Sequence, residues 1–439
     1  MAELKRQLGL LDATMINVGT IIASAIFLVP RDIAAQLHAS SLMLLVWVVG
    51  GVVSLLGALS VSELGAALPK AGGQYVYLAE AYGPVWGYLY GWTASVVINP
   101  ASIAAIAVAF ATYFGYFVPL GAWGVKGLAV GSIVALTVIN SLGVRPGTLT
   151  QNVLTLLKIG LVVFLIVIAF TLPGGSSAHF APVWPDAPLG SLPGPFGVAM
   201  VAVLWAYDGW IEVCYVGGEV KQPGRTLPRA LILSTLSVIA LFCLVTASYT
   251  YVLSPARMAQ SPLVASDAAQ VSLGRPGAAF VAATILISTL GANNGIVLTA
   301  ARIPYAMARD GVLPGWLGAV HPRFLTPTRS LVAQAVVSIV LTLGGSYDRL
   351  FTYVVFASFL FYAMACGAVV RLRARAPDLP RPYRTLGYPV TPLVFIAFAT
   401  WLVANTIVEQ PGNSAVGAAL MLAGLPVYYW KRRSAAAVA

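Results

Sequence analysis

Charge is scarce in this sequence. Charged residues make up 9% of its 439 residues, whereas a soluble protein of this length carries about a quarter. Hydrophobic residues make up 59% of the sequence and gather in long runs. Runs of this length are typical of helices surrounded by lipid, not of the core of a soluble protein. This composition excludes a chain of two or three soluble domains. It predicts one membrane domain over residues 1–439, with no soluble domain at either end.

Cysteine and histidine are scarce as well. Each of the three cysteines lies inside an apolar run, and no pair has the spacing of a disulfide or a metal site. The three histidines fall in loops, and neither a Gly-x-Gly-Asp nor a Gly-x-Ser-x-Gly stretch occurs. The paired catalytic groups of an intramembrane enzyme are therefore missing, and we expect no metal and no cofactor. The residues concerned are Cys214, Cys243, Cys366, His38, His179 and His321.

Acidic residues are fewer than basic ones, 14 against 25, and the net charge is +11. In a soluble protein this balance would suggest nucleic acid as a partner. Here the basic residues sit in short loops between apolar runs, which is the topology signal of a membrane protein. The sequence therefore predicts a lipid bilayer, and no nucleic acid, as the surroundings of the chain.

The apolar runs predict twelve transmembrane helices, because a helix needs about 20 apolar residues to cross the hydrocarbon of a bilayer. The ninth run is short. The expected spans lie near residues 10–37, 42–67, 84–118, 121–142, 149–172, 195–219, 230–253, 276–308, 330–345, 350–371, 388–408 and 413–430.

Lysine and arginine in the loops predict the orientation, since cytoplasmic loops are rich in them. One side carries most of the basic residues: Lys5, Arg6, Lys70, Arg145, Lys221, Arg225, Arg229, Arg302, Arg309, Arg323, Arg329, Arg371, Arg373, Arg375, Arg381, Arg384, Lys431, Arg432 and Arg433. The other side carries Arg31, Lys126, Arg257, Arg275 and Arg349. Both termini are therefore expected in the cytoplasm, with the protein in the plasma or inner membrane, and this agrees with an even number of spans.

The N-terminal stretch has two interpretations. A basic start, an apolar run and the small residues Ala23-Ser24-Ala25 are typical of a cleavable signal peptide. Asp12 interrupts the apolar part, however, and the run continues to Val29. We therefore interpret the stretch as the first spanning helix.

Two runs carry signs of a helix that breaks inside the membrane. The first is Gly19–Phe27, and the second is Trp205-Ala206-Tyr207-Asp208-Gly209-Trp210 in the sixth run. Small residues, a β-branched pair and a glycine beside an aspartate lower helix propensity. Backbone that leaves the helix at this depth must line a cavity or be buried in protein. Both segments could instead be ordinary small-residue packing faces.

The matching positions of the breaks suggest two inverted five-helix repeats, about 10–172 and 195–371, followed by two helices within 388–430. Amide groups that are free at a half-helix N-terminus attract a carboxylate. Carbonyls that are free at the end of the other half attract an ammonium. A pair of broken helices is thus a receptor for a zwitterion.

Several segments resemble a known family. GTIIASAIFLVP in the first helix and ELGAALPKAGGQYVYLAEAYGP after the second resemble motifs of the amino acid–polyamine–organocation (APC) superfamily. LWAYDGW with YVGGEVKQPGRTLPRAL, and NPASIAAIAVAFATYF in the third helix, are similar to its L-type amino acid transporter (LAT) branch. ARIPYAMARDGVLPGWLGAVHPRFLTP resembles the segment after the eighth helix. The resemblance covers nearly the whole chain.

The resemblance implies ten helices in two inverted repeats plus two more, with a substrate amino acid held between the breaks. By motif, the amides near Ser24 and Ala25 would hold the carboxylate. The carbonyls of Ile21, Trp205 and Asp208 would hold the ammonium, next to Ala206, and the Trp205 ring would gate the site.

The chain departs from the family pattern at two places. Ala23 and Ala25 stand where relatives have glycine, which implies a smaller pocket or a weaker carboxylate contact. The loop FVPLGAWGVKG lacks the cysteine that joins animal members to a heavy subunit. We therefore expect a single-chain transporter of bacterial type with no disulfide-linked partner.

Lys158 lies in the middle of the fifth apolar run, where a charge costs about 2.5–3.5 kcal/mol on insertion scales. In sodium-independent relatives a lysine on this helix resembles a tethered replacement for sodium, set against helices 1 and 8. Lys158 could also release a proton during the cycle. The alternative is a side chain that extends to the cytoplasmic surface.

The other polar residues at membrane depth leave alternatives open. Asp208 could cap the resumed helix, and Glu212 could bond to a neighbouring helix; both could select a cationic substrate or carry a proton. Tyr207 and Asn294 are candidate pocket or gate residues, with packing and interhelical bonding as alternatives. The cytoplasmic charges could close an inner gate or solvate helix ends: Glu63, Arg302, Arg309 and Asp310.

The sequence thus predicts a sodium-independent transporter of neutral L-amino acids that works by exchange or proton coupling. A cationic amino acid or a polyamine is the alternative substrate. A membrane solute sensor on the same fold and an intramembrane enzyme are the alternatives of another class.

Overall fold

The computed structural model describes residues 3–185, 188–344 and 347–436. The described residues form helices with no strand, apart from one isolated bridge between Leu8 and Val220. The side chains of Arg349, Arg432 and Arg433, used above for orientation, lie outside the described residues. The helices of the first half are α1 (Leu10–Ile21), α2 (Ala25–Leu37), α3 (Ser40–Ala67), α4 (Gln74–Tyr82), α5 (Pro84–Thr93), α6 (Asn99–Phe114), α7 (Ala122–Ser141) and α8 (Val144–Thr171).

The second half is also helical. Its helices are α9 (Pro193–Ala206), α10 (Pro223–Val252), α11 (Pro255–Gln260), α12 (Val264–Leu273), α13 (Pro276–Ala300), α14 (Arg302–Arg309), α15 (Thr328–Gly344), α16 (Tyr347–Arg375), α17 (Val390–Glu409), α18 (Pro411–Leu422) and α19 (Gly424–Ala436). Five short segments are 3₁₀- or π-helical, namely η1 (Ala94–Ile98), η2 (Ser177–Phe180), η3 (Leu189–Ser191), η4 (Glu212–Glu219) and η5 (Gly315–Gly318).

The described residues include eight helices long and apolar enough to cross a membrane, and the bent pair α1–α2 makes a ninth. The segments α9–η4, α15 and α18–α19 occupy the three remaining predicted ranges. An all-α membrane fold of about twelve spans is therefore confirmed. The two inverted repeats stay a prediction.

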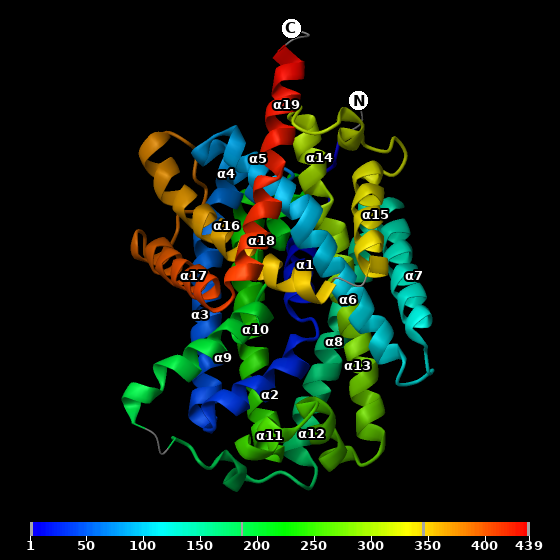
Figure 1. The fold of residues 1–439 in the computed structure, drawn as a ribbon, viewed down its shortest axis with the longest axis vertical. Coiled ribbons are helices and arrows are strands. Elements are labelled where there is room, and N and C mark those ends of the chain that lie inside the picture. The colour runs from blue at the N-terminus through cyan, green and yellow to red at the C-terminus, as the bar shows by residue number, and fades with distance from the viewer. Residues whose placement is uncertain (1–2, 186–187, 345–346, 437–439) are drawn as a thin grey trace.

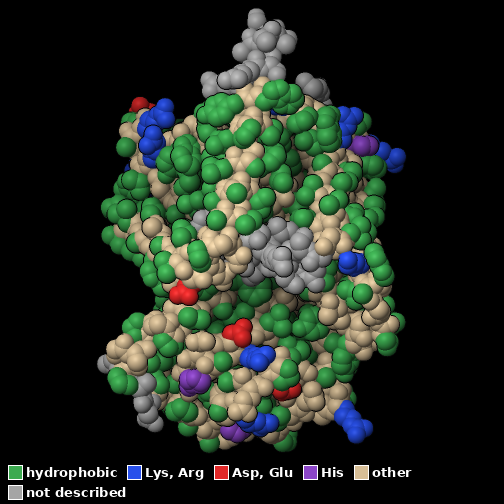
Figure 2. Space-filling model, in the orientation of Figure 1, with side chains coloured by type: hydrophobic (Ala, Val, Ile, Leu, Met, Phe, Trp, Pro, Cys, Tyr) green, Lys and Arg blue, Asp and Glu red, His purple; other side chains and the backbone are tan. Residues whose placement is uncertain are grey.

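The two chain ends lie at the same end of the molecule, at the top of Figure 1, while α11 and α12 lie at the opposite end. An even number of crossings produces this arrangement. Figure 2 shows flanks covered by hydrophobic side chains, with lysine and arginine mostly toward the two ends. This is the surface expected of a protein surrounded by lipid.

The first helix lies at the centre of the bundle. α1 packs against α8, α10 and α13, and every residue from Ile16 to Ile21 is buried. α10 lies along α3, and α6 lies along α13. A helix that is buried on all sides can lose its regular hydrogen bonds only where neighbouring groups replace them, and α1 does so at its end.

Candidate substrate site between two broken helices

The first break falls where the sequence predicts it. α1 ends at Ile21 and α2 begins at Ala25, and the two axes differ by 45°. Ser24 precedes the first helical residue of α2. The first amides of a helix have no acceptor within it. The start of α2 therefore presents N–H groups, and a positive helix-dipole end, at the break.

The second break follows α9, which ends at Ala206. Gly209 has a φ of +101°, a conformation that side chains with a β-carbon rarely adopt, and so the chain turns there. Helix resumes as the 3₁₀ segment η4 at Glu212, not as a regular α-helix. The backbone between Asp208 and Glu212 is therefore a non-helical turn of the chain. It is not one turn of an α-helix.

The two breaks touch each other. The Thr20 hydroxyl lies 3.3 Å from the carbonyl oxygen of Gly209. The Asn17 side chain donates to the carbonyl of Trp210 at 2.6 Å and accepts from the amide of Val213 at 2.9 Å. Asn17 thus supplies both a donor and an acceptor to backbone that has left the helix, which holds the second break against the first.

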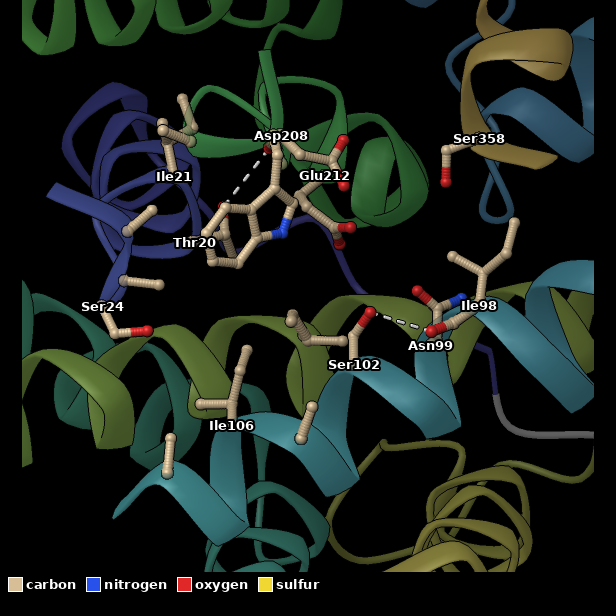
Figure 3. A pocket seen from close by; sticks show the side chains of 18 of the residues that line it. Thr20, Ile21, Ser24, Ile98, Asn99, Ser102, Ile106, Asp208, Glu212 and Ser358 are labelled. Atoms are coloured by element: carbon tan, nitrogen blue, oxygen red, sulfur yellow. Dashed lines mark hydrogen bonds between the residues drawn. The ribbon is translucent and has the colours of Figure 1, made fainter. Parts of the chain in front are cut away.

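A cavity of about 450 Å³ lies between the breaks (Figure 3). Its size is within the range of small-molecule sites. Seven of the residues singled out from the sequence line it, and they come from both breaks: Ile21, Ser24, Ala25, Trp205, Ala206, Asp208 and Glu212. The sequence analysis assigned two segments about 180 residues apart to one site. In the structure both segments line the same cavity.

Two of the carbonyls proposed for an ammonium already accept backbone hydrogen bonds. Ile21 accepts from the amide of Ala23 at 2.9 Å, and Trp205 accepts from the amides of Tyr207 and Asp208, the latter at 3.1 Å. A carbonyl oxygen has two lone pairs, so Ile21 retains one acceptor site. The arrangement can bind a zwitterion, with donors at the start of α2 and acceptors at the ends of α1 and α9.

Lys158 is fully buried behind the first break. Its ammonium donates to the carbonyls of Gly19 at 2.8 Å, Ile22 at 2.7 Å and Ser288 at 2.9 Å. All three ammonium hydrogens therefore have an acceptor. The side chain joins α8 to α1 and α13 and does not extend to the cytoplasmic surface.

Both carboxylates of the second break bond to other helices. Asp208 accepts from the Tyr362 hydroxyl on α16 at 2.7 Å, and Glu212 accepts from the Thr299 hydroxyl on α13. Asp208 does not cap η4, because no side chain caps that segment. The expectation of a bond from Glu212 to a neighbouring helix is confirmed, although the residue also lines the cavity.

Comparisons with known proteins place these features in a family. The sequence profile described as amino acid permease matches residues 8–430. The chain belongs to the amino acid permease family. It is 34% identical to the serine/threonine exchanger SteT of Bacillus subtilis over 436 residues, covering 98% of each chain. It is 33% identical to the human b(0,+)-type amino acid transporter 1, over 97% of this chain and 88% of that one.

Human large neutral amino acids transporter small subunit 2 is 32% identical over 98% of this chain and 82% of its own length. Membership of the APC superfamily, with similarity to its LAT branch, agrees with the motifs in the breaks. The relatives are transporters, which favours a transporter over an enzyme.

Two candidate residues of this permease lie away from the cavity. Tyr207 is buried between Trp47 and Phe242, and its hydroxyl donates to the carbonyl of Trp47 at 3.1 Å. Asn294 donates to Gln151 at 2.8 Å and accepts from Asn140 at 2.8 Å, so it joins α13 to α8 and α7. Neither lines the cavity, and both make the packing and bonding contacts that were the alternatives.

Sequence reasoning missed the opposite wall of the permease cavity. α6 contributes Asn99 and Ser102, α4 contributes Gln74, and α16 contributes Ser358. One signal was present: Pro100 lacks the N–H of a regular helix, and the π-helical segment η1 precedes it, closed by a 2.9 Å bond from the Asn99 side chain to the carbonyl of Ala94. The third spanning segment therefore contains a π-turn beside the cavity.

The charges near the chain ends of the permease form pairs. Arg302 and Glu219, both 0% exposed, join α14 to the end of η4 at 2.7 Å. Glu63 pairs with Arg373 at 2.6 Å and Arg381 at 3.2 Å. Tyr75 donates to Asp310 at 2.8 Å; burial, and then this bond, raise the pKa of the Tyr75 hydroxyl, which keeps its proton.

The N-terminal segment bonds to the backbone at Glu219, the acidic member of the Arg302–Glu219 pair. The amides of Gln7 and Leu8 donate to the carbonyl of Glu219 at 2.8 and 3.0 Å, and Lys221 donates to the carbonyl of Leu8 at 2.9 Å. These bonds fasten Gln7 and Leu8 to the end of η4.

Proposed function

We propose that this amino acid permease is a sodium-independent secondary transporter that carries amino acids by alternating access, through exchange or proton coupling. One observation carries the proposal: two broken helices place helix-end donors and carbonyl acceptors on one cavity of about 450 Å³. The donors and acceptors match the carboxylate and the ammonium that all α-amino acids share. The names of the relatives, which specify amino acids, support the same activity.

The proposed site assigns a role to each group. The amides of Ser24 and Ala25 bind the carboxylate, and the carbonyls of Ile21, Trp205 and Asp208 bind the ammonium. The Trp205 ring, with Ala206 beside it, covers the bound substrate as a gate. Most of the other residues that line the cavity are apolar or aromatic, which favours neutral L-amino acids.

Sodium independence rests on Lys158. Its ammonium lies against carbonyls of α1 and α13, where it supplies a fixed positive charge to the first break. A permanently bound cation removes the need for a dissolved one. The side chain therefore takes the place that a sodium ion would occupy, and transport is expected to proceed in sodium-free buffer.

We propose that the two termini are cytoplasmic, as the loop charges predict, and that the structure is a state closed to the cytoplasm by Arg302, Glu219 and the N-terminal segment. Opening that side requires η4 and α14 to separate. The permease is proposed to work as a single chain without a disulfide-linked subunit, in the plasma or inner membrane.

Uptake into proteoliposomes tests the proposal. The purified full-length chain is reconstituted in sodium-free buffer and given labelled serine, threonine, leucine or lysine, with and without internal amino acid and with and without a pH gradient. We expect saturable uptake of at least one amino acid. Uptake that requires internal substrate identifies exchange, and uptake that requires the gradient identifies proton coupling. Binding without any uptake would indicate a sensor and overturn the proposal.

A further inference from the structure

Two segments that are far apart in the chain meet at the end of the molecule that carries both termini. One is the start of α10, and the other is the loop that joins α16 to α17. A β-carbon on Gly224 would lie 2.9 Å from Pro382, so the two segments pack closely. The amide of Lys221 donates to the carbonyl of Leu8, which places this contact beside the N-terminal segment. Figure 1 shows the α16–α17 connection at the same end.

Basic side chains predominate on both segments. Residues 221–229 and 375–390 are described throughout, and their exposed charged side chains are five basic ones and a single acidic one, Asp378. An excess of lysine and arginine is general in cytoplasmic loops, so the excess alone identifies no ligand. The five basic residues are Lys221, Arg225, Arg229, Arg375 and Arg384.

The carboxylate of Glu63 on α3 fixes the loop and is itself fully used. It pairs with Arg373 and Arg381, and it accepts from the amide of Thr385 at 2.7 Å. Arg384 is the residue before Thr385, and its exposed guanidinium forms no hydrogen bond or ion pair with any described residue. The loop therefore has a defined position, and it presents one arginine whose charge has no counterpart.

The start of α10 presents two more such arginines. Arg225 and Arg229 lie one helical turn apart, both are exposed, and neither guanidinium pairs with a described residue. Arg225 follows Gly224, and Arg384 lies two positions after Pro382, so three guanidinium groups lie around the contact between the two segments. Like charges held near one another repel, and an anion bound among them would stabilise the arrangement.

The surroundings of these arginines indicate where the anion comes from. On α10, the face that carries Arg229 continues with Leu233 and Leu236, each 47% exposed. On the other segment, Leu386 and Val390 are 62% and 64% exposed. Both α10 and α17 pack on α3. Exposed aliphatic side chains on spanning helices contact acyl chains, so the arginines lie where the hydrocarbon ends and the lipid phosphates begin.

We propose that the start of α10 and the α16–α17 loop form a docking surface for an anionic phospholipid, in the leaflet on the side of the termini. The guanidinium groups of Arg225, Arg229 and Arg384 donate to the lipid phosphate, a pairing that arginine makes in bidentate geometry. The acyl chains lie against the exposed aliphatic side chains of α10 and α17. A zwitterionic lipid carries its own cation and therefore leaves the charge of the arginines uncompensated.

Lipid binding to the unmodified protein is the first test. The purified full-length chain in detergent is titrated with phosphatidylglycerol or with phosphatidylcholine of the same acyl chains, and bound lipid is counted by native mass spectrometry. Each basic residue near an anionic surface contributes about fivefold in affinity, so we expect phosphatidylglycerol to bind at least about tenfold more tightly. Soluble sn-glycerol 3-phosphate has the phosphate without acyl chains, and it should not displace the lipid.

Variants then assign the preference to the three arginines. The triple variant Arg225→Gln, Arg229→Gln, Arg384→Gln should reduce the preference for phosphatidylglycerol to about twofold or less. The same three positions changed to lysine keep the charge and should retain most of the preference. Because the three side chains have no partner in the described structure, their replacement removes no internal contact.

The matched control removes the same charge from the opposite end of the molecule. Arg31, Arg257 and Arg275 are also exposed, and their triple change to glutamine should leave the lipid preference intact. An equal loss in this control would show a general effect of net charge and overturn the docking surface. Equal binding of the two lipids by the unmodified protein would overturn it as well, as would displacement by glycerol 3-phosphate, which identifies a site for a soluble anion. Amino acid uptake does not enter these measurements, so the docking surface and the proposed function stand or fail separately.

Discussion

The two broken helices meet at one cavity, but side chains of opposite charge stabilise the two breaks. At the first break, buried carbonyls accept from an ammonium and a hydroxyl, since Lys158 donates to Gly19 and Ile22 while Ser288 donates to Ala23 at 2.9 Å. At the second break, carboxylates accept from Tyr362 and Thr299. The first break is thus fastened by positive charge from outside the helix, and the second presents its own negative charge to its neighbours.

This difference has a structural consequence. The first break depends mainly on Lys158 of α8, which donates to two of its carbonyls and to one on α13, with Ser288 of α13 as a second donor, whereas the second shares its support among Asn17 and two neighbouring helices. Removing one contact should therefore be far more damaging at the first break than at the second. Three substitutions test this asymmetry.

The largest effect is expected from Lys158→Ala. It removes three charge-assisted hydrogen bonds, each worth about 1.5–3 kcal/mol, from buried carbonyls at the first break and on α13. The α1–α2 bend should lose its defined geometry. Initial uptake rates in proteoliposomes should fall more than about 100-fold, by the usual relation of about 1.4 kcal/mol per tenfold.

The matched control for Lys158→Ala is Lys126→Ala, because Lys126 bonds to a single carbonyl, that of Leu343. Its uptake should stay near the unmodified rate. Size-exclusion chromatography of both variants separates a folding defect from a transport defect. A Lys158→Ala protein that transports at the unmodified rate would show that the cation is dispensable at the first break.

An intermediate effect is expected where the breaks touch, from Gly209→Ala. The φ of +101° is strained for alanine, and the new methyl would lie 3.3 Å from atoms of Thr20. A left-handed conformation costs a residue with a β-carbon about 1–2 kcal/mol. We expect uptake to fall about tenfold, with the larger change in the apparent affinity for substrate.

Gly160→Ala is the control for Gly209→Ala, since a β-carbon on Gly160 of α8 meets nothing within 4 Å. Alanine there should leave transport unchanged and stabilise the helix slightly. Equal transport by the two variants would mean that the second break does not need its turn at Gly209.

The sequence predicted the breaks and Lys158 because their signals are local. A glycine beside an aspartate, or a lysine within an apolar run, is unusual in itself. Gln74 and Ser358 were missed because a single polar residue carries no such signal, and only the packing of α4 and α16 brings them to the cavity.

Tyr207 shows the same limit in the other direction. Its place within the second break suggested a pocket residue, but the chain stops being helical at Ala206 and the Tyr207 ring packs against Trp47. The tyrosine that bonds to Asp208 is Tyr362, 154 positions away in the chain. The sequence therefore locates the break better than it predicts where the side chains of the break point.

The smallest effect is expected from Tyr362→Phe, which removes one of the hydroxyls that support the second break. The lost bond to Asp208 is a single bond to a charged group, but the cavity can admit water to the carboxylate in its place. We expect the KM for amino acid to rise about threefold while the maximal rate stays within about twofold, on the scale of about 0.5–1.5 kcal/mol for one hydrogen bond. Tyr116→Phe, at an exposed ring far from the site, serves as the control. If Tyr362→Phe lowered uptake as much as Lys158→Ala, the second break would also depend on one contact. The proposed asymmetry between the two breaks would then be wrong.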